Sequence, residues 1–477
     1  MTEGIDGPLA VAFLVMVLLG YFSVVLVSRG AISNKLAWAL SPAFGTGICS
    51  IIFFFFRRPV FTAEFALLGV MFAMWVRYRQ RTISKTASPA GMPILAALMI
   101  GALAWVTFGT LISIDRSPHG GWDGFAIWNS HARYLYRAGP VWQHYIRNTA
   151  HPDYPLLLPA ATARLWRYIG RDAPDAPGVQ NLLLAISGVT ILAATLWELQ
   201  RGSLSFLLPL LLVGTPFYLT LAVWQYADVP LSVYILATLG LICVHWQREQ
   251  DRARLLVLAG FTAGCAAWTK NEGLLFVLVT SVLLFLPIFW NRAKTLQRLA
   301  MFSLGLLVPL AVTFYFKFAV PWPSDIVQNR AYPELMSKIT DVHRYTMIVT
   351  AFLKTSGSFG RWAIHPAIPL IALFAVWGVN RRVVRDGGWI TSAAALAVML
   401  SGYFAVYVIT ALPLDIHLAT SLDRLLMQLW PSLLLVAGLA VDRTGPFLRC
   451  TTPTGCSEIQ LIRDFVNRLT AVVSWSG

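Results

Sequence analysis

The residues best suited to chemistry are gathered in one segment of the chain. Asp123 stands in GGWDGFAIW, and the motif HPDYPLLLP supplies His151, Asp153 and Tyr154. A carboxylate among aromatic residues and glycines is the type of group that accepts a proton in general base catalysis. Asp123 would also serve as the N-cap of a short helix expected over 124–138, which stabilises a helix by about 1 kcal/mol. The prolines around Asp153 indicate either site lining or a stiff turn. Neighbouring residues expected to line the same site are Trp122, Trp128 and His131.

A second group of candidates consists of polar and charged residues at the ends of apolar segments. They occur in QYADVPL, WTKNEGLLF and SLDRLLMQLWP and are Tyr226, Asp228, Lys270, Glu272 and Arg424. An ionisable side chain fully inside lipid costs roughly 2.5 to 3.5 kcal/mol, so such groups pair with each other, face a cavity or reach the interface. Lys270 is equally well explained as a structural ion pair with Glu272 or Asp228.

Cations at the ends of membrane spans suit one class of ligand, a lipid-linked phosphate. Lys or Arg at headgroup depth holds phosphate oxygens through charge-assisted hydrogen bonds, while an apolar groove accepts the lipid tail. The candidates for this role are Lys270, Arg330, Arg361 and Arg424. His343 and His365 are weaker candidates, because a lone histidine more often satisfies its neighbours than binds a ligand.

The composition of the whole chain indicates what kind of scaffold must position these residues. Of 477 residues, 57% are hydrophobic and only 12% are charged, whereas soluble domains carry roughly 25% charged residues. With a mean hydropathy of +0.65, these values exclude a water-soluble globule, a disordered chain and a disulfide scaffold. The net charge of +15 resides mostly in short loops, where it sets membrane topology rather than binding nucleic acid. Neither the five cysteines nor any other residues show typical metal-ligand spacing, so the sequence assigns no cofactor and leaves a divalent metal open.

The apolar segments predict an all-α bundle of transmembrane helices, because each span takes about 20 apolar residues. No internal repeat is found, so one continuous membrane domain is expected. About thirteen spans are predicted, at 9–28, 37–56, 61–76, 92–114, 179–197, 203–223, 228–246, 255–269, 272–290, 299–320, 363–379, 389–410 and 424–441.

The distribution of arginine and lysine predicts the orientation of the bundle. Basic clusters follow the third, seventh, ninth and eleventh spans, which places these loops in the cytoplasm. The external loops 115–178 and 321–345 and nearly every candidate residue then lie on the outer face, which indicates a cavity at the outer membrane boundary. Arg57 and Arg58 are the exception to this pattern. The chain divides into extra N-terminal spans at 1–91, a core at 92–441 and a cytoplasmic tail at 442–477 with an amphipathic helix.

Five motifs carry a resemblance to a known family. In chain order, WDGFAIWNSHARYLYRAG, HPDYPLLLP, QYADVPL, WTKNEGLLF and SLDRLLMQLWP resemble bacterial membrane glycosyltransferases of the GT-C superfamily. The better-known relatives of these enzymes are the protein O-mannosyltransferases and the lipid A aminoarabinose transferases. The resemblance covers roughly 92–441 and implies a GT-C-like fold in the bacterial plasma membrane. It also implies inverting transfer of a sugar from a polyprenyl phosphate, such as undecaprenyl phosphate, to a glycan, lipid or protein acceptor on the extracytoplasmic face.

The resemblance assigns a role to Asp123, which matches the catalytic acid of the first external loop in this family. Its carboxylate would take the proton of the acceptor hydroxyl, and the cations named above would hold the donor phosphate. The chain departs from the mannosyltransferase pattern in two ways, because Gly124 follows Asp123 where a second acid is common and no sizeable soluble part lies near the C-terminus. An alternative is a sugar-lipid transporter or flippase whose path the same charges would line. Repeat halves with matching broken helices are typical of transporters, and the sequence shows neither.

Overall fold

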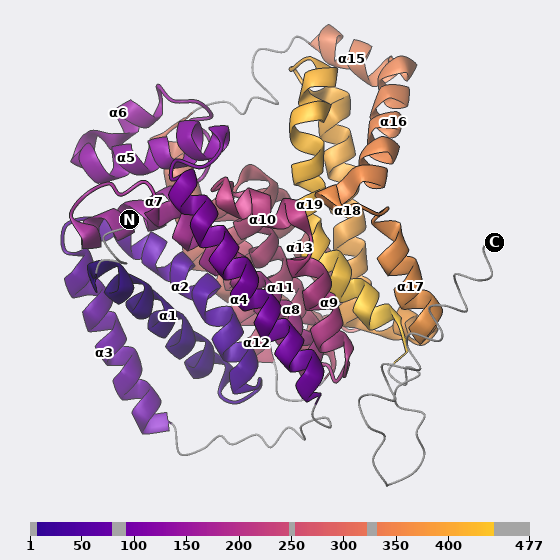
Figure 1. Cartoon of the computed structure of the whole chain (residues 1–477), viewed down its shortest axis with the longest axis horizontal. Coiled ribbons are helices and arrows are strands. Elements are labelled where there is room, and N and C mark those ends of the chain that lie inside the picture. Colours follow the sequence, from indigo (N-terminus) through magenta and orange to yellow (C-terminus); the bar gives the residue numbers. More distant parts are fainter. Residues whose placement is uncertain (1–6, 79–91, 248–252, 322–331, 443–477) are drawn as a thin grey trace.

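The structure is a computed structural model that describes residues 7–78, 92–247, 253–321 and 332–442, and within these ranges it is helical throughout (Figure 1). The described residues form no β-strand, and their one isolated bridge joins Val379 to Val441. The all-α class predicted from the sequence is therefore confirmed. Arg330 and the predicted amphipathic helix of the tail lie outside the described residues.

Ten of the helices are long and apolar enough to cross a membrane. An α-helix satisfies its own backbone hydrogen bonds, which is what a segment in lipid must do. The molecule is thus built as a multi-pass membrane protein. The ten are α1 (Gly7–Ser28), α2 (Asn34–Phe56), α3 (Val60–Tyr78), α4 (Pro93–Arg116), α8 (Ala176–Glu198), α11 (Asp228–Gln247), α13 extended by a short 3₁₀ turn (Asn271–Phe289), α14 (Arg292–Ala319), α18 (Gly387–Ile409) and α19 (Leu414–Ala440).

Three of the thirteen predicted spans are not among these ten helices. The segment 203–223 is two helices, α9 (Leu204–Val213) and α10 (Pro216–Val223), which meet at an angle of 57°. Proline has no N–H to continue the hydrogen-bond ladder, so Pro216 starts a new helix. The segments 255–269 and 363–379 are α12 (Ala253–Thr269) and α17 (Ala367–Trp377), of 17 and 11 residues. Seventeen residues is the lower limit for crossing a bilayer, and eleven is too few.

Although α12 is shorter than the ten long helices, it returns the chain across the bundle. The residue after it, Lys270, lies beside Asp228 at the start of α11, with Nζ and Oδ1 3.0 Å apart. The helices α11 and α12 therefore form a hairpin whose open end is near Asp228. This arrangement brings the turns before α11 and α13 to the same end of the molecule.

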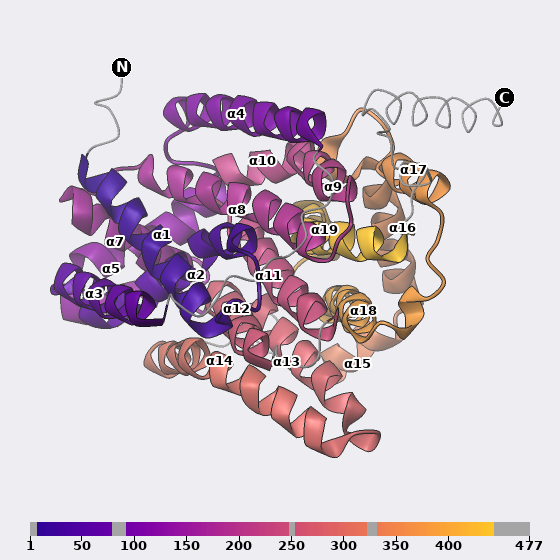
Figure 2. The ribbon, with the colours of Figure 1, turned by 90° about the horizontal axis from the view of Figure 1, so that it is seen from below.

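Helix α11 forms the centre of the bundle. It is the most deeply buried of the ten long helices, with 94% of its apolar window inside the protein, and it packs against α8, α12, α18 and α19. Figure 2 shows α11 surrounded by other helices and α4 along the outer edge. A helix that is apolar all round, as α11 is, belongs in such a central position.

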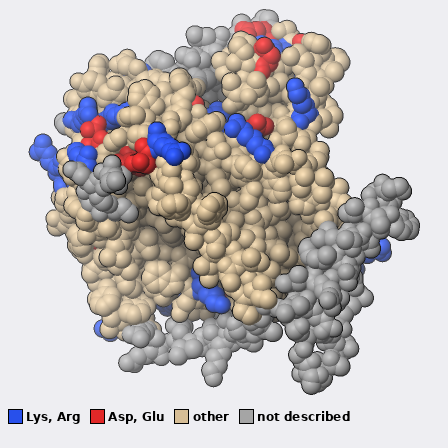
Figure 3. Space-filling model, in the orientation of Figure 1, with Lys and Arg blue, Asp and Glu red and all other residues tan. Residues whose placement is uncertain are grey.

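Three short helices, α5, α6 and α15, lie at one end, uppermost in Figure 1, where they cap the long helices. Figure 3 shows acidic and most basic side chains of this face in the same upper part, above a broad uncharged middle. Such a band suits contact with lipid tails. The short helices are α5 (Asn129–Arg137), α6 (Trp142–Ile146), α7 (Leu157–Ile169), α15 (Tyr332–Thr340) and α16 (Val342–Ser358).

A buried ion pair attaches α3 to α7. Arg164 Nε and Nη2 donate to the two carboxylate oxygens of Glu64 at 2.5 and 2.7 Å, and the Tyr168 hydroxyl donates to the same carboxylate at 2.7 Å. Nη2 of Arg164 also donates to the carbonyl of Ala12 in α1. Since Glu64 and Arg164 are almost completely buried, each charge depends on the other for compensation.

Candidate functional site

The site begins with an ion pair between the first loop and the last long helix. Nη1 of Arg424, in α19, donates to Oδ2 of Asp123, and both side chains are about one-fifth exposed. Asp123 precedes a π-helical turn, η2 (Gly124–Trp128), that leads into α5, so the helix expected over this segment is present. The Asp123 side chain makes no capping hydrogen bond to this helical turn. Its carboxylate accepts a hydrogen bond from Arg424 instead.

Two glycines fix the position of this loop against the turn between α10 and α11. The N–H of Gly121 donates to the Trp224 carbonyl at 3.0 Å. A Cβ on Gly124 would lie 2.4 Å from that same oxygen, and a Cβ on Gly121 would lie 2.9 Å from the Tyr226 ring. The glycines of GGWDG are therefore needed for close packing. Because Gly121 and Gly124 have no side chains, the loop can approach the α10–α11 turn closely, and this approach sets the position of Asp123.

The α10–α11 turn itself is held by polar contacts to the first loop. Gln225 has a positive φ of 61°, and its side chain donates to the Pro118 carbonyl and accepts a hydrogen bond from Asn129 at 2.6 Å. Tyr226 extends from this turn, with its ring 5.2 Å from the Arg424 guanidinium. Its hydroxyl accepts a long hydrogen bond, 3.4 Å, from the N–H of Asp123. Burial raises the pKa of Tyr226, so it stays a neutral phenol.

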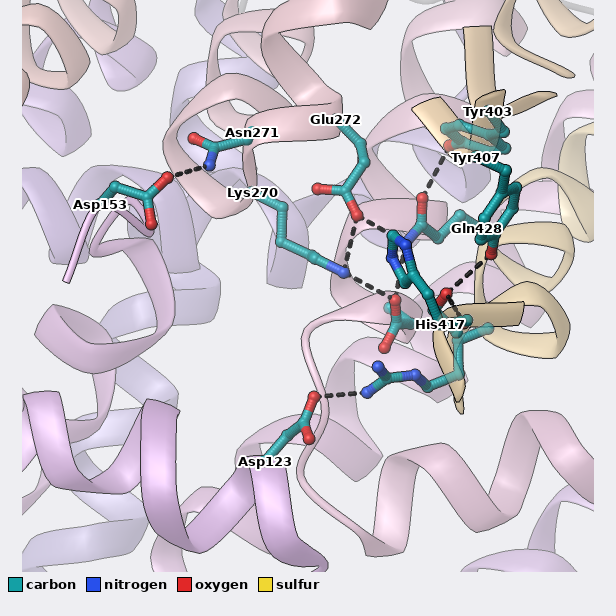
Figure 4. Close-up of polar contacts among 12 residues, drawn as sticks. Asp123, Asp153, Lys270, Asn271, Glu272, Tyr403, Tyr407, His417 and Gln428 are labelled. Carbon is teal, nitrogen blue, oxygen red and sulfur yellow. Dashed lines mark hydrogen bonds and ion pairs between the residues drawn. The ribbon is translucent and has the colours of Figure 1, made fainter. Parts of the chain in front are cut away.

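Behind this pair lies a buried cluster of charges shown in Figure 4. Lys270 Nζ contacts Asp228 at 3.0 Å and Glu272 at 2.9 Å, so the lysine serves both acids. Asp228 is almost fully buried and Glu272 is about one-fifth exposed. Gln428, one helical turn beyond Arg424, donates to Asp228 at 2.6 Å. The cluster thus continues from the surface pair into the bundle.

The sequence did not single out Gln428, although it links two helices. Its amide oxygen accepts a hydrogen bond from the Tyr403 hydroxyl of α18 at 2.7 Å, and both residues are fully buried. Below Arg424, the Tyr407 hydroxyl pairs with Ser421 at 2.7 Å. The available signal was a polar residue at i+4 from Arg424 within an apolar helix.

A second set of polar residues surrounds Asp153, and one of them is adjacent in sequence to the first cluster. Asn271 Nδ2 donates to its carboxylate at 2.6 Å, and Lys317 of α14 donates to its backbone carbonyl at 2.5 Å and to the Asn271 side chain at 2.7 Å. Asn271 follows Lys270 directly. Asp153 therefore fixes the HPDYP turn to the start of α13, and Lys317, which the sequence did not identify, completes the contact.

The aromatic and histidine residues of the loop form a packed layer. The Tyr154 ring lies between His151 and Trp128, with centroids 4.7 and 5.5 Å away. Burial raises the pKa of Tyr154, and the charges of Lys270 and Glu272 also act on it, so the layer adjoins the charged cluster. His131 is fully buried, with Nε2 2.7 Å from the Thr149 hydroxyl, and burial lowers its pKa to about 3.

The remaining sequence candidates within the described ranges make no side-chain hydrogen bond to Asp123 or Arg424. Arg361 stacks over Phe217 and Trp224, at 4.4 and 5.4 Å, and acts electrostatically on Asp423, the neighbour of Arg424. Trp122 is 64% exposed, so it presents its ring outward. His343 and His365 are exposed and lie on or beside local turns.

The assembled site contains three carboxylates, Asp123, Asp228 and Glu272, and two cations, Lys270 and Arg424. The acids exceed the cations by one, and Nε of Arg424 has no hydrogen-bond partner within the described part of the chain. An anion that reaches Arg424 would compete with Asp123 for the guanidinium. Across the described residues, no group of three or more His, Cys, Asp or Glu side chains is arranged to hold a metal ion.

Comparison of the chain with models of protein families, with curated proteins and with solved structures finds no match.

Proposed function

We propose that the protein is a membrane glycosyltransferase that moves a sugar from a polyprenyl phosphate to the hydroxyl of a glycan, lipid or protein acceptor. The observation that carries this proposal is the Asp123–Arg424 pair, a partly exposed acid and cation at the edge of a buried charged cluster. One carboxylate and a phosphate-binding cation are the groups that such a transfer needs. The setting is the bacterial plasma membrane, with the site on its extracytoplasmic face.

In this mechanism Asp123 takes the proton from the acceptor hydroxyl as the oxygen attacks the anomeric carbon. The bond between that carbon and the phosphate oxygen breaks, and the phosphate leaves with the electron pair, so the configuration at the anomeric carbon is inverted. Arg424 and Lys270 stabilise the charge that builds on the leaving phosphate. No covalent sugar–enzyme intermediate is required, since a single carboxylate acts.

Binding of the donor would also prepare the base. In the structure Arg424 is bound to Asp123, which occupies the carboxylate. A donor phosphate that bonds to the guanidinium, including its unpartnered Nε, would draw it away from Asp123. The carboxylate would then be available to the acceptor hydroxyl only when a donor is present.

The transporter alternative has less support. A translocation path needs polar groups near the middle of the bilayer. Asp123, Asp228, Lys270 and Glu272 lie at the ends of helices or in turns, and among these residues and their described side-chain partners only Arg424 and Gln428 lie inside a long helix, α19. The central helix α11 beyond Asp228 is apolar or hydroxyl-bearing as far as His245 in its last turn.

The test is sugar transfer by membranes that contain the Asp123→Asn variant. The donors are radiolabelled sugars on undecaprenyl phosphate, and the readout is label in the acceptor fraction. We expect transfer to fall by roughly 10²-fold or more, as is typical when a general base is removed, with unchanged expression and melting temperature in detergent. Asp172→Asn is the matched control, because Asp172 pairs with Arg133 and Arg137 in the same loop. Full transfer by Asp123→Asn would remove the mechanism.

A further inference from the structure

A large groove lies at the end of the bundle opposite Asp123. It has a volume of about 890 Å³ and is bordered by α2, α4, α8 and α9, within the range of ligand-sized cavities, ~300–1,000 Å³. Its walls come from the first turns of α2, α4 and α9 and the last turns of α8. The other ends of α4 and α8 adjoin the first loop, so this groove is on the far side of the membrane from the candidate site.

The groove is open because α4 stands away from the bundle. Only 6% of the apolar window of α4 is buried, and Figure 2 shows this helix along the periphery. The wall residues are mainly apolar, among them Trp38, Met92, Ala194 and Phe206. Such walls in a membrane protein suit a hydrocarbon chain.

Two polar side chains indicate where the polar head of a ligand would lie in the groove. Among the described residues that line the groove, Lys35, in the first turn of α2, is the only charged one, and its ammonium lies 4.1 Å from the centre of the Trp197 ring at the end of α8. Ser205, in the first turn of α9, is 1% exposed, yet its hydroxyl has no hydrogen-bond partner in the described part of the chain. A buried hydroxyl without a partner is costly, which indicates a ligand that supplies an acceptor.

The electrostatics at this end favour an anion. Three helices, α2, α4 and α9, begin here, and the N-terminus of a helix carries a partial positive charge. The buried Glu198 accepts a hydrogen bond from the N–H of Ser33 and offsets this charge at α2, whereas α4 and α9 have no side-chain cap. Lys35 adds a full positive charge at headgroup depth, where long basic side chains extend toward the interface. The ligand must therefore combine an anionic head, a nearby hydrogen-bond acceptor and an apolar tail.

We propose that this groove binds one anionic phospholipid of the surrounding membrane. Its phosphate lies beside Lys35, an ester carbonyl accepts the hydrogen bond of Ser205, and an acyl chain lies along α4 against Ala194. A polyprenyl phosphate fits less well, because its tail has no ester carbonyl. The site is separate from the proposed reaction and does not depend on it.

The experiment uses the full chain, purified in mild detergent and incubated with equal amounts of phosphatidylglycerol, phosphatidylcholine and undecaprenyl phosphate. Bound lipid is then counted by native mass spectrometry. The variants are Lys35→Gln, Ser205→Ala and Ala194→Phe, which remove the charge, the hydroxyl and the space for the chain. Lys294→Gln is the matched control, since Lys294 is an exposed lysine at the same end of the bundle, on α14.

We expect the wild type to retain phosphatidylglycerol in preference to the other two lipids. Lys35→Gln should lower its retention about fivefold, the effect of one basic residue near an anionic lipid, and remove the preference over phosphatidylcholine. Ser205→Ala should weaken retention of both glycerol lipids, Ala194→Phe should abolish it, and Lys294→Gln should change nothing. Equal retention by the wild type and Lys35→Gln, or a wild-type preference for undecaprenyl phosphate, would overturn the proposal. Lys35→Gln and Ser205→Ala keep the test valid if Ala194→Phe does not fold.

Discussion

Arg424 donates a hydrogen bond to Asp123 from 301 residues further along the chain. The two side chains come from the last long helix and the first loop, and each is only partly exposed. A contact of this kind holds the loop on the bundle, and it leaves a cation and an acid side by side, each about one-fifth exposed.

The guanidinium group of Arg424 is expected to hold the donor phosphate. Arg424→Gln should raise the KM for the lipid-phosphate donor about tenfold or more, because a charge-assisted hydrogen bond is lost. Arg424→Lys should keep part of this affinity, since the charge remains but the paired N–H groups do not. The measurement is donor KM in the membrane transfer assay. Arg147→Gln is the control, because Arg147 is an exposed first-loop arginine whose side chain donates a hydrogen bond to the Ala319 carbonyl and takes no part in the site. An unchanged donor KM in Arg424→Gln would place phosphate binding elsewhere.

The lysine of the buried cluster is expected to be a major source of stability. Lys270→Met leaves Asp228 and Glu272 without their cation, and breaking a buried ion pair costs about 3 to 5 kcal/mol. The double variant Lys270→Met/Asp228→Asn should recover a large part of this loss, because one of the two unpaired charges is removed. The melting temperatures of the single and double variants in detergent measure this coupling. Additive losses in the double variant would show that the pair is not coupled.

A methyl group on Gly124 is expected to disturb the site without altering any polar residue. The new Cβ would lie 2.4 Å from the Trp224 carbonyl, so the loop must move away from the α10–α11 turn. A displacement of about 1 Å can cost 10²-fold in rate, and we expect Gly124→Ala to lose transfer on that scale. Gly101→Ala in α4 is the control, since nothing lies within 4 Å of its added Cβ. Wild-type transfer by Gly124→Ala would mean that Asp123 does not need this placement.

Much of the helical fold could be predicted from the sequence, because apolar length is a local property. Every predicted apolar segment contains a helix, and the three segments that are not among the ten long helices differ from them in length or by a bend. Pro216 was a visible reason for the bend in 203–223. The short helices α12 and α17 could not be told from spans by composition, since tertiary packing, not the sequence of one segment, determines how deep each helix lies.

The site was predictable only in part, because contacts between distant segments leave no local pattern. The pairing of Lys270 with Glu272 and Asp228 was among the predicted alternatives, since the turn is tight and the charges border apolar runs. Gln428 was missed because an uncharged amide, unlike a buried charge, does not call for a counter-ion, so its partners Asp228 and Tyr403 leave no pattern in the sequence. Glu64 was also missed, although an acid inside an apolar segment is itself a signal of a buried partner, here Arg164.

The Glu64–Arg164 pair is expected to hold α3 on the protein. Arg164→Met leaves the carboxylate buried without a cation, which should lower stability by about 3 to 5 kcal/mol. The double variant Arg164→Met/Glu64→Leu should be close to the wild type, because an apolar pair of similar size replaces the ions. Arg137→Gln removes a far more exposed arginine from its pair with Asp172 and should cost less than about 1 kcal/mol. Detergent melting curves compare these variants, and a single variant as stable as its double would contradict the assignment.

The buried imidazole of His131 is expected to make the first loop sensitive to acid. Burial lowers its pKa from 6.5 to about 3 in the folded protein, so unfolding takes up a proton below pH 6.5. The stability from neutral His131 is present above that pH and is lost as the pH falls toward 3, by roughly 2 to 3 kcal/mol between about pH 7 and 4.5. His131→Gln should therefore show a flatter dependence of melting temperature on pH than the wild type. His144→Gln, at an exposed histidine of the same loop, should retain the wild-type slope, and equal slopes in all three proteins would show that His131 does not titrate on unfolding.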